Sequence, residues 1–152
     1  MLLVATFFYS AAAAVAAFLA LEAYLAVAAA DGTYPAVVLA AVAAVGQVLG
    51  KLLWYWAGAG TTRLPWLRRK LDSARVAAAL ARWRDRADGR PVYLALLLLA
   101  SAFAGLPPFM VMSVVAGVLR VRVWLFVATG LAGRFARFWL LLEAAHHAWF
   151  LL

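Results

Sequence analysis

The sequence predicts an all-α integral membrane protein with two inverted repeats, each a re-entrant helical hairpin followed by a transmembrane helix. Three observations predict this fold class. Of the 152 residues, 69% are hydrophobic and 13% are charged, whereas an ordinary soluble domain has about 45–50% apolar and about 25% charged residues. Basic residues cluster between the two halves of the chain. Three long stretches carry no charge, namely residues 2–21, 32–50 and 91–119.

The first repeat is expected within residues 2–60. Residues 2–30 carry one charge, Glu22, and they exceed the roughly 20 residues of one perpendicular span. The sequence Asp31-Gly32-Thr33-Tyr34-Pro35 then predicts a turn, because Gly and Pro interrupt regular structure. A second apolar stretch, residues 36–60, follows and ends in aromatic residues typical of a membrane interface. We therefore expect a hairpin and then a span.

A basic linker, residues 61–90, joins the two halves. From Arg63 to Arg90 it has nine Lys or Arg and three Asp residues, which indicates a cytoplasmic location and argues against nucleic acid as a partner. Apolar residues recur at helical spacing over residues 64–86, predicting one amphipathic helix on the inner leaflet. A solvated helix is the alternative, but Trp66 and Trp83 favour the interfacial one. Membrane lipids are the expected partners.

A break is predicted in the middle of residues 91–119, a charge-free stretch of 29 residues. Gly105, Pro107 and Pro108 lie there, and two adjacent prolines remove backbone donors and disrupt the preceding turn. A straight helix through this point is not expected.

Basic residues flank this stretch at both ends, with Arg90 before it and Arg120 and Arg122 after it. The positive-inside rule places both ends on one side, as in a re-entrant hairpin. Residues 123 to about 142 then form a full crossing, so that residues 91–147 form a second unit, inverted relative to the first. Four simple spans remain the alternative.

Four charged residues lie at or near membrane depth: Glu22, Lys51, Arg134 and Arg137. A charge at the bilayer centre costs about 2.5–3.5 kcal/mol on insertion scales, so each is a candidate for substrate binding or transport. Lys51 and Arg137 have an alternative, because long side chains near an interface reach out to it. Glu22 and Arg134 lie deeper, and we hypothesise that they form an ion pair between the repeats.

Enzymatic chemistry is not expected. The sequence has no Cys, no Ser-His-Asp arrangement and no phosphate loop, and the adjacent His146 and His147 would point about 100° apart on a helix. We predict no catalytic residue, no bound metal and no cofactor. The oligomeric state stays open, a homo-oligomer included.

The chain resembles the DedA/VTT superfamily, formerly called SNARE-associated proteins, from about residue 18 to 142. The first half contributes Glu22, Tyr55, Gly58 and the sequence Gly46-Gln47-Val48-Leu49-Gly50. The second half contributes Ala104-Gly105-Leu106-Pro107-Pro108-Phe109, Ala116-Gly117-Val118-Leu119-Arg120 and Gly130-Leu131-Ala132-Gly133-Arg134-Phe135-Ala136-Arg137-Phe138, similar to the small bacterial branch.

This resemblance implies two re-entrant hairpins that face each other in the bacterial cytoplasmic membrane, and a role in moving lipids or polyprenyl phosphate carriers. Two features depart from the family's pattern. Lys51 stands where larger members often have an acidic residue, and residues 101–112 lack the Arg residues usual around the prolines. The expected function is transport or scrambling of an anionic lipid. The alternative is a non-transporting membrane assembly or envelope-maintenance protein whose basic helix recruits lipid or a partner.

Overall fold

The computed structural model describes residues 1–152 except 16–19, 61–64, 106–107 and 151–152, and the regular structure of the described residues is helical. The prediction of an all-α chain is confirmed over this part. The helices are α1 (Leu2–Val15), α2 (Leu21–Ala30), α3 (Ala36–Ala59), α4 (Pro65–Leu71), α5 (Ala74–Ala87), α6 (Pro91–Ala104), α7 (Phe109–Val118) and α8 (Val123–Phe150).

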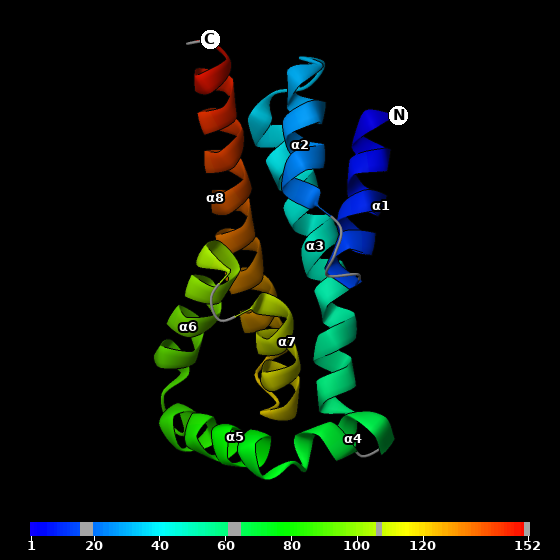
Figure 1. Ribbon diagram of the computed structural model, residues 1–152. Helices are drawn as coiled ribbons and strands as arrows, with labels where there is room; N and C mark the ends of the chain where they lie inside the picture. The colour runs from blue at the N-terminus through cyan, green and yellow to red at the C-terminus, as the bar shows by residue number, and fades with distance from the viewer. Residues whose placement is uncertain (16–19, 61–64, 106–107, 151–152) are drawn as a thin grey trace.

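Two long helices form the frame of the molecule (Figure 1). With 24 and 28 residues, α3 and α8 extend about 36 and 42 Å at 1.5 Å per residue. Both are long and apolar enough to cross a bilayer. The shorter α1 and α2 lie toward the end where α1 begins and α8 ends, α6 and α7 lie toward the opposite end, and α4 and α5 run crosswise beneath that opposite end.

The shorter helices end where the local sequence requires it. Gly105 caps α6 with a left-handed φ of 78°, and its N–H donates to the Ser101 carbonyl at 2.9 Å. Glycine adopts this conformation without a Cβ penalty, which is why it ends helices so often. Pro108 is the residue before α7 and has an extended ψ of 125°. The helix is thus interrupted between Ala104 and Phe109, where the break was expected; Pro107 lies outside the described residues.

Glycines allow the helices to approach closely. A Cβ on Gly50 would lie 2.6 Å from the Ala11 carbonyl oxygen of α1, and one on Gly133 would lie 2.6 Å from Ala102 Cβ of α6. A Cβ on Gly117 of α7 would overlap the Tyr55 carbonyl of α3. Such backbone contacts are typical of helix pairs held by van der Waals packing rather than by large side chains.

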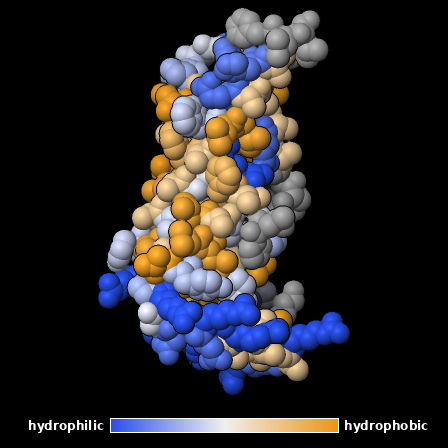
Figure 2. All heavy atoms as spheres, turned by 90° about the vertical axis from the view of Figure 1, so that its left-hand side faces the viewer, coloured by the Kyte–Doolittle hydropathy of each residue, from blue (hydrophilic) through white to orange (hydrophobic). Residues whose placement is uncertain are grey.

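The apolar side chains lie in two clusters and on the outside. Leu25, Leu39 and Phe138 belong to the cluster among α1, α2, α3 and α8, whereas Leu98 and Phe126 belong to the cluster among α3, α6, α7 and α8. Figure 2 shows hydrophobic side chains over the middle of one face and hydrophilic ones gathered at the end formed by α4 and α5. Monomeric soluble proteins rarely expose large contiguous apolar patches. This pattern agrees with a protein that has lipid around its middle.

Two predicted boundaries are wrong. The basic linker does not form one helix, because α4 ends at Leu71 and α5 begins at Ala74. Ser73 lies between them with extended backbone (φ −61°, ψ 138°), a conformation and residue type favoured before a helix. The last helix does not end near residue 142 but continues to Phe150. Arginine has a high helix propensity, so the two arginines inside α8 do not interrupt it.

Candidate functional site

The described ends of four shorter helices meet near the middle of the molecule against α3 and α8 (Figure 1). The C-terminal ends of α1 and α6 and the N-terminal ends of α2 and α7 point there from opposite ends. A cavity of about 220 Å³ lies at this junction. Its polar lining comes from Glu22, Gln47, Lys51 and Arg134, and its apolar lining includes Phe109 and Phe138. We call this the central cavity.

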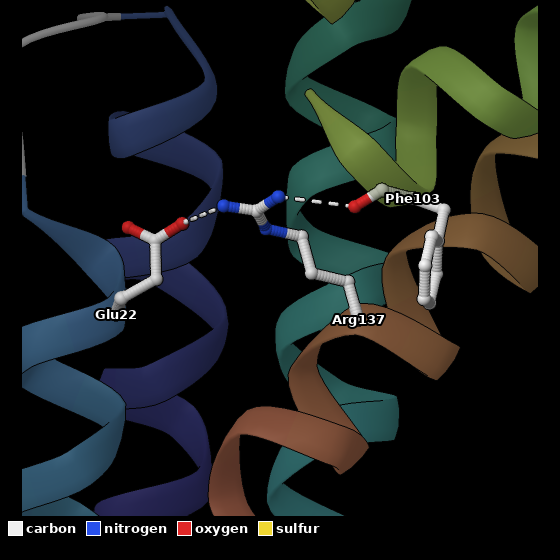
Figure 3. Close-up of polar contacts among 3 residues, drawn as sticks. All are labelled: Glu22, Phe103 and Arg137. Carbon is white, nitrogen blue, oxygen red and sulfur yellow. Dashed lines mark hydrogen bonds and ion pairs between the residues drawn. The ribbon is translucent and has the colours of Figure 1, made fainter. Parts of the chain in front are cut away.

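Arg137 connects the two groups of shorter helices (Figure 3). Its Nη2 donates to Glu22 Oε1 at 3.2 Å, and its Nη1 donates to the Phe103 carbonyl at 3.0 Å. Glu22 lies in the first turn of α2, and Phe103 lies in the last turn of α6. The hypothesis that Glu22 pairs with Arg134 is wrong, because α8 presents Arg137 to the carboxylate instead.

Lys51 makes a corresponding contact on the other side of the site. Its side chain is 4% exposed, and its Nζ donates to the Ala14 carbonyl in the last turn of α1. The last carbonyls of a helix lack intrahelical partners and carry partial negative charge, so a cation stabilises them. Lys51 and Arg137 each cap the C-terminal end of a shorter helix. Both side chains thus have partners within the molecule.

Arg134 lies in the central cavity without an anionic partner. Its guanidinium carbon lies 5.3 Å from the Phe109 ring centroid and 5.9 Å from that of Phe138, within the range of cation–π attraction. Its Nε is buried and has no hydrogen-bond partner among the described residues. Among the described carboxylates, none forms an ion pair with Arg134 or Lys51. The positive charge of Arg134 is therefore left without an ion-pair partner among the described residues.

The site has more positive than negative charge. Lys51 and Arg134 line the cavity together with one carboxylate among the described residues, that of Glu22, and Arg137 already pairs with this carboxylate. Uncompensated charge in a poorly solvated place is costly, so an anion that enters the cavity would gain from both remaining cations. A planar guanidinium can bind a phosphate or carboxylate through two parallel hydrogen bonds. The geometry suits a small anionic group.

Sequence reasoning missed three contributors to the site. Gln47 is 5% exposed and lines the cavity one helical turn before Lys51. A polar amide four residues from a buried Lys shares its helix face, and this spacing was the available signal. The sequence contains no comparable signal for the ring of Phe109 or the carbonyl of Phe103, because their roles depend on where α6 and α7 pack against α8.

Other parts of the chain offer less chemistry. Within the described residues, no group of three or more His, Cys, Asp or Glu side chains is placed to hold a metal ion. His147 Nδ1 lies 2.9 Å from the Glu143 carbonyl of its own helix.

Comparisons of the chain with protein-family models, with curated proteins and with solved structures gave no match.

Proposed function

We propose that this chain spans a membrane and transports or scrambles an anionic lipid, whose head group passes through the central cavity. The single observation that carries the proposal is the placement of Lys51 and Arg134 in that cavity without a carboxylate partner. Charged residues at membrane depth are costly and usually serve a substrate or ion pathway. The apolar exterior keeps the lipid tails in the bilayer while the cations attract the head group.

The packing of the helices supports an inverted-repeat architecture. Gly50 of α3 faces the Ala11 carbonyl and Ala14 Cβ of α1, and Gly133 of α8 faces the corresponding pair, Leu99 and Ala102, of α6. In both cases the next residue of the long helix, Lys51 or Arg134, lines the cavity. With at most 14 residues, α1, α2, α6 and α7 extend about 21 Å or less, too short for a hydrocarbon core of about 30 Å. They suit two re-entrant hairpins.

The resemblance to the DedA/VTT superfamily extends the proposal to the class of substrate. Members of that family are linked to phospholipids and polyprenyl phosphate carriers, and both have the phosphate that the central cavity favours. The bacterial cytoplasmic membrane is the proposed location. Orientation follows the positive-inside rule, with α4 and α5 in the cytoplasm.

Topology can be tested with single cysteines at Arg90 and Arg122, which flank α6 and α7. A re-entrant hairpin requires that a membrane-impermeant thiol reagent label both positions from the same side. Labelling from opposite sides would exclude the hairpin. Because the chain has no native Cys, no background substitution is needed.

Transport can be tested in liposomes with labelled anionic and zwitterionic lipids. Arg134→Gln should lower the rate of anionic lipid movement at least tenfold, because the cavity loses a positive charge that attracts the phosphate. The matched control is Arg122→Gln, since Arg122 is exposed and lies outside the cavity. Equal rates for wild type and Arg134→Gln, at equal folded yield, would contradict the proposal.

A second function is favoured by the exposed basic residues of α4 and α5. None of the residues of α5 is buried, and its last turn carries Arg84 and Arg86. Such a surface attracts anionic lipid or an acidic partner without any transport. If liposomes with wild-type protein move no lipid, and neutralising Arg84 and Arg86 abolishes membrane recruitment of a cytoplasmic partner, this function replaces the first.

A further inference from the structure

A second hollow lies apart from the charges of the central cavity, between α5, α7 and the end of α3. Its volume is about 560 Å³, within the roughly 300–1,000 Å³ of small-molecule sites. Leu80 and Trp83 of α5 form one wall, and Val111 and Val115 of α7 form the other. We call this the α5 groove. Met110 lines both hollows, so the groove reaches the edge of the central cavity.

An unpaired donor lies at the groove. Trp54 of α3 lines it, and the indole Nε1–H of Trp54 is buried with no acceptor among the described residues. Buried tryptophan N–H groups usually find a partner, and leaving one unpaired costs about 1–3 kcal/mol. The Trp54 side chain as a whole is only partly buried, and a rotation of its ring would be needed to turn this donor toward an acceptor in the groove.

The groove is also charged at its edge. Arg75 lines it from the first turn of α5 and is exposed. The apolar side of α5 faces the groove without being fully covered, because Val76, Leu80 and Trp83 are only partly buried. An occupant that suits this surface has an apolar chain, a hydrogen-bond acceptor next to that chain and an anionic group beyond it.

We propose that the α5 groove binds an anionic diacyl glycerophospholipid from the leaflet on the side of α4 and α5. One acyl chain occupies the groove along α7, an ester carbonyl accepts from Trp54 Nε1–H, and the phosphate lies against Arg75. Lipid bound in the groove lies next to the central cavity, and the Met110 side chain lies between the two. The site does not depend on the transport function, since a structural lipid would bind in the same way.

The test measures lipid binding by the full chain in detergent, using native mass spectrometry with a diacyl phosphatidylglycerol and the matching phosphatidylcholine. Wild type should bind the phosphatidylglycerol more tightly. Trp54→Phe should weaken its binding about fivefold, the effect of one lost hydrogen bond, and Arg75→Gln by a similar factor. Ala79→Phe fills the groove from α5 without removing a polar group and should weaken binding at least tenfold.

Two controls separate the groove from the rest of the molecule. Trp124→Phe changes a tryptophan that is 63% exposed and lies outside the groove, so it should leave binding unchanged. Arg122→Gln, which removes an exposed charge outside the groove, should also leave it unchanged. A failure of this proposal stays distinct from a failure of the transport function, because this test changes residues of the groove and the transport test changes Arg134. Helical circular dichroism establishes that each variant is folded.

Three results would overturn the proposal. The first is equal affinity of wild type for the two lipids, and the second is unchanged binding in folded Ala79→Phe. The third is loss of binding in Arg134→Gln but not in Trp54→Phe, which would place the lipid in the central cavity. A dimer that dissociates when Ala79→Phe is introduced, with lipid binding unchanged, would assign the groove to a second copy of the chain instead.

Discussion

Substituting Arg137 with Gln should destabilise the protein more than the same substitution of Glu22 or Arg134. Arg137 donates to the Phe103 carbonyl at 3.0 Å and to Glu22 at 3.2 Å, and it thereby joins α2 to α6 through α8. A hydrogen bond to a charged group contributes about 1.5–3 kcal/mol. The ion-paired side chains of Arg137 and Glu22 are 29% and 47% exposed, which favours the lower end of that range. We expect a loss of about 2–3 kcal/mol.

The asymmetry between the two partners makes the prediction specific. Glu22→Gln removes one interaction and leaves Arg137 bonded to Phe103, so it should cost about 1 kcal/mol. The double variant removes the carboxylate that Arg137→Gln leaves unpaired, so its cost should fall short of the sum of the single costs by about 1 kcal/mol. Arg134→Gln should cost about 1 kcal/mol or less, because Arg134 forms no ion pair among the described residues and loses only its cation–π contacts with Phe109 and Phe138.

The assay is reversible unfolding in mixed micelles, followed by helical circular dichroism, with the free energy of unfolding extrapolated to zero denaturant. The result that would refute the reasoning is a larger loss for Arg134→Gln than for Arg137→Gln. That outcome would mean that the Glu22 carboxylate pairs with Arg134 in the membrane. Equal losses for Glu22→Gln and Arg137→Gln would show that the Phe103 contact contributes nothing.

The same unfolding experiment tests three further changes. Gly117→Ala should cost about 2–3 kcal/mol of unfolding free energy, because a Cβ there would overlap the Tyr55 carbonyl. Its control is Gly32→Ala, which has no atom within 4 Å of the added Cβ and should cost only the strain of its φ of 69°, about 1 kcal/mol. Equal costs for the two variants would contradict the close contact at Gly117. Arg120→Gly should stabilise the protein by about 1 kcal/mol, because Arg120 has a left-handed φ of 52° directly after α7 and glycine adopts that φ without strain. A loss of stability in this variant would contradict the strain at Arg120. Tyr55→Phe should cost about 1 kcal/mol through loss of the bond its hydroxyl donates to the Val121 carbonyl, and an unchanged stability would show that this bond contributes nothing.

The helical class and the positions of several breaks were predictable because they depend on local chemistry. Long runs without charge require helices that satisfy their own backbone groups in an apolar surrounding. The glycine that ends α6 and the proline that precedes α7 act through their own backbone angles, and neither needs a distant neighbour. The division between α4 and α5 was less predictable, because periodicity continues across Ser73 and only the cap conformation separates the helices.

The sequence by itself determined that Glu22, Lys51, Arg134 and Arg137 lie in apolar stretches and must be compensated. Only the tertiary structure decided which group compensates each of these charges. Arg134 and Arg137 are three residues apart and share a helix face, so helical spacing cannot tell which of them reaches the Glu22 carboxylate far earlier in the chain. The choice depends on how far α8 is shifted and rotated against α2 and α6. Close contacts at Gly133 set that packing, and they leave Arg134 in the cavity with its Nε unpaired.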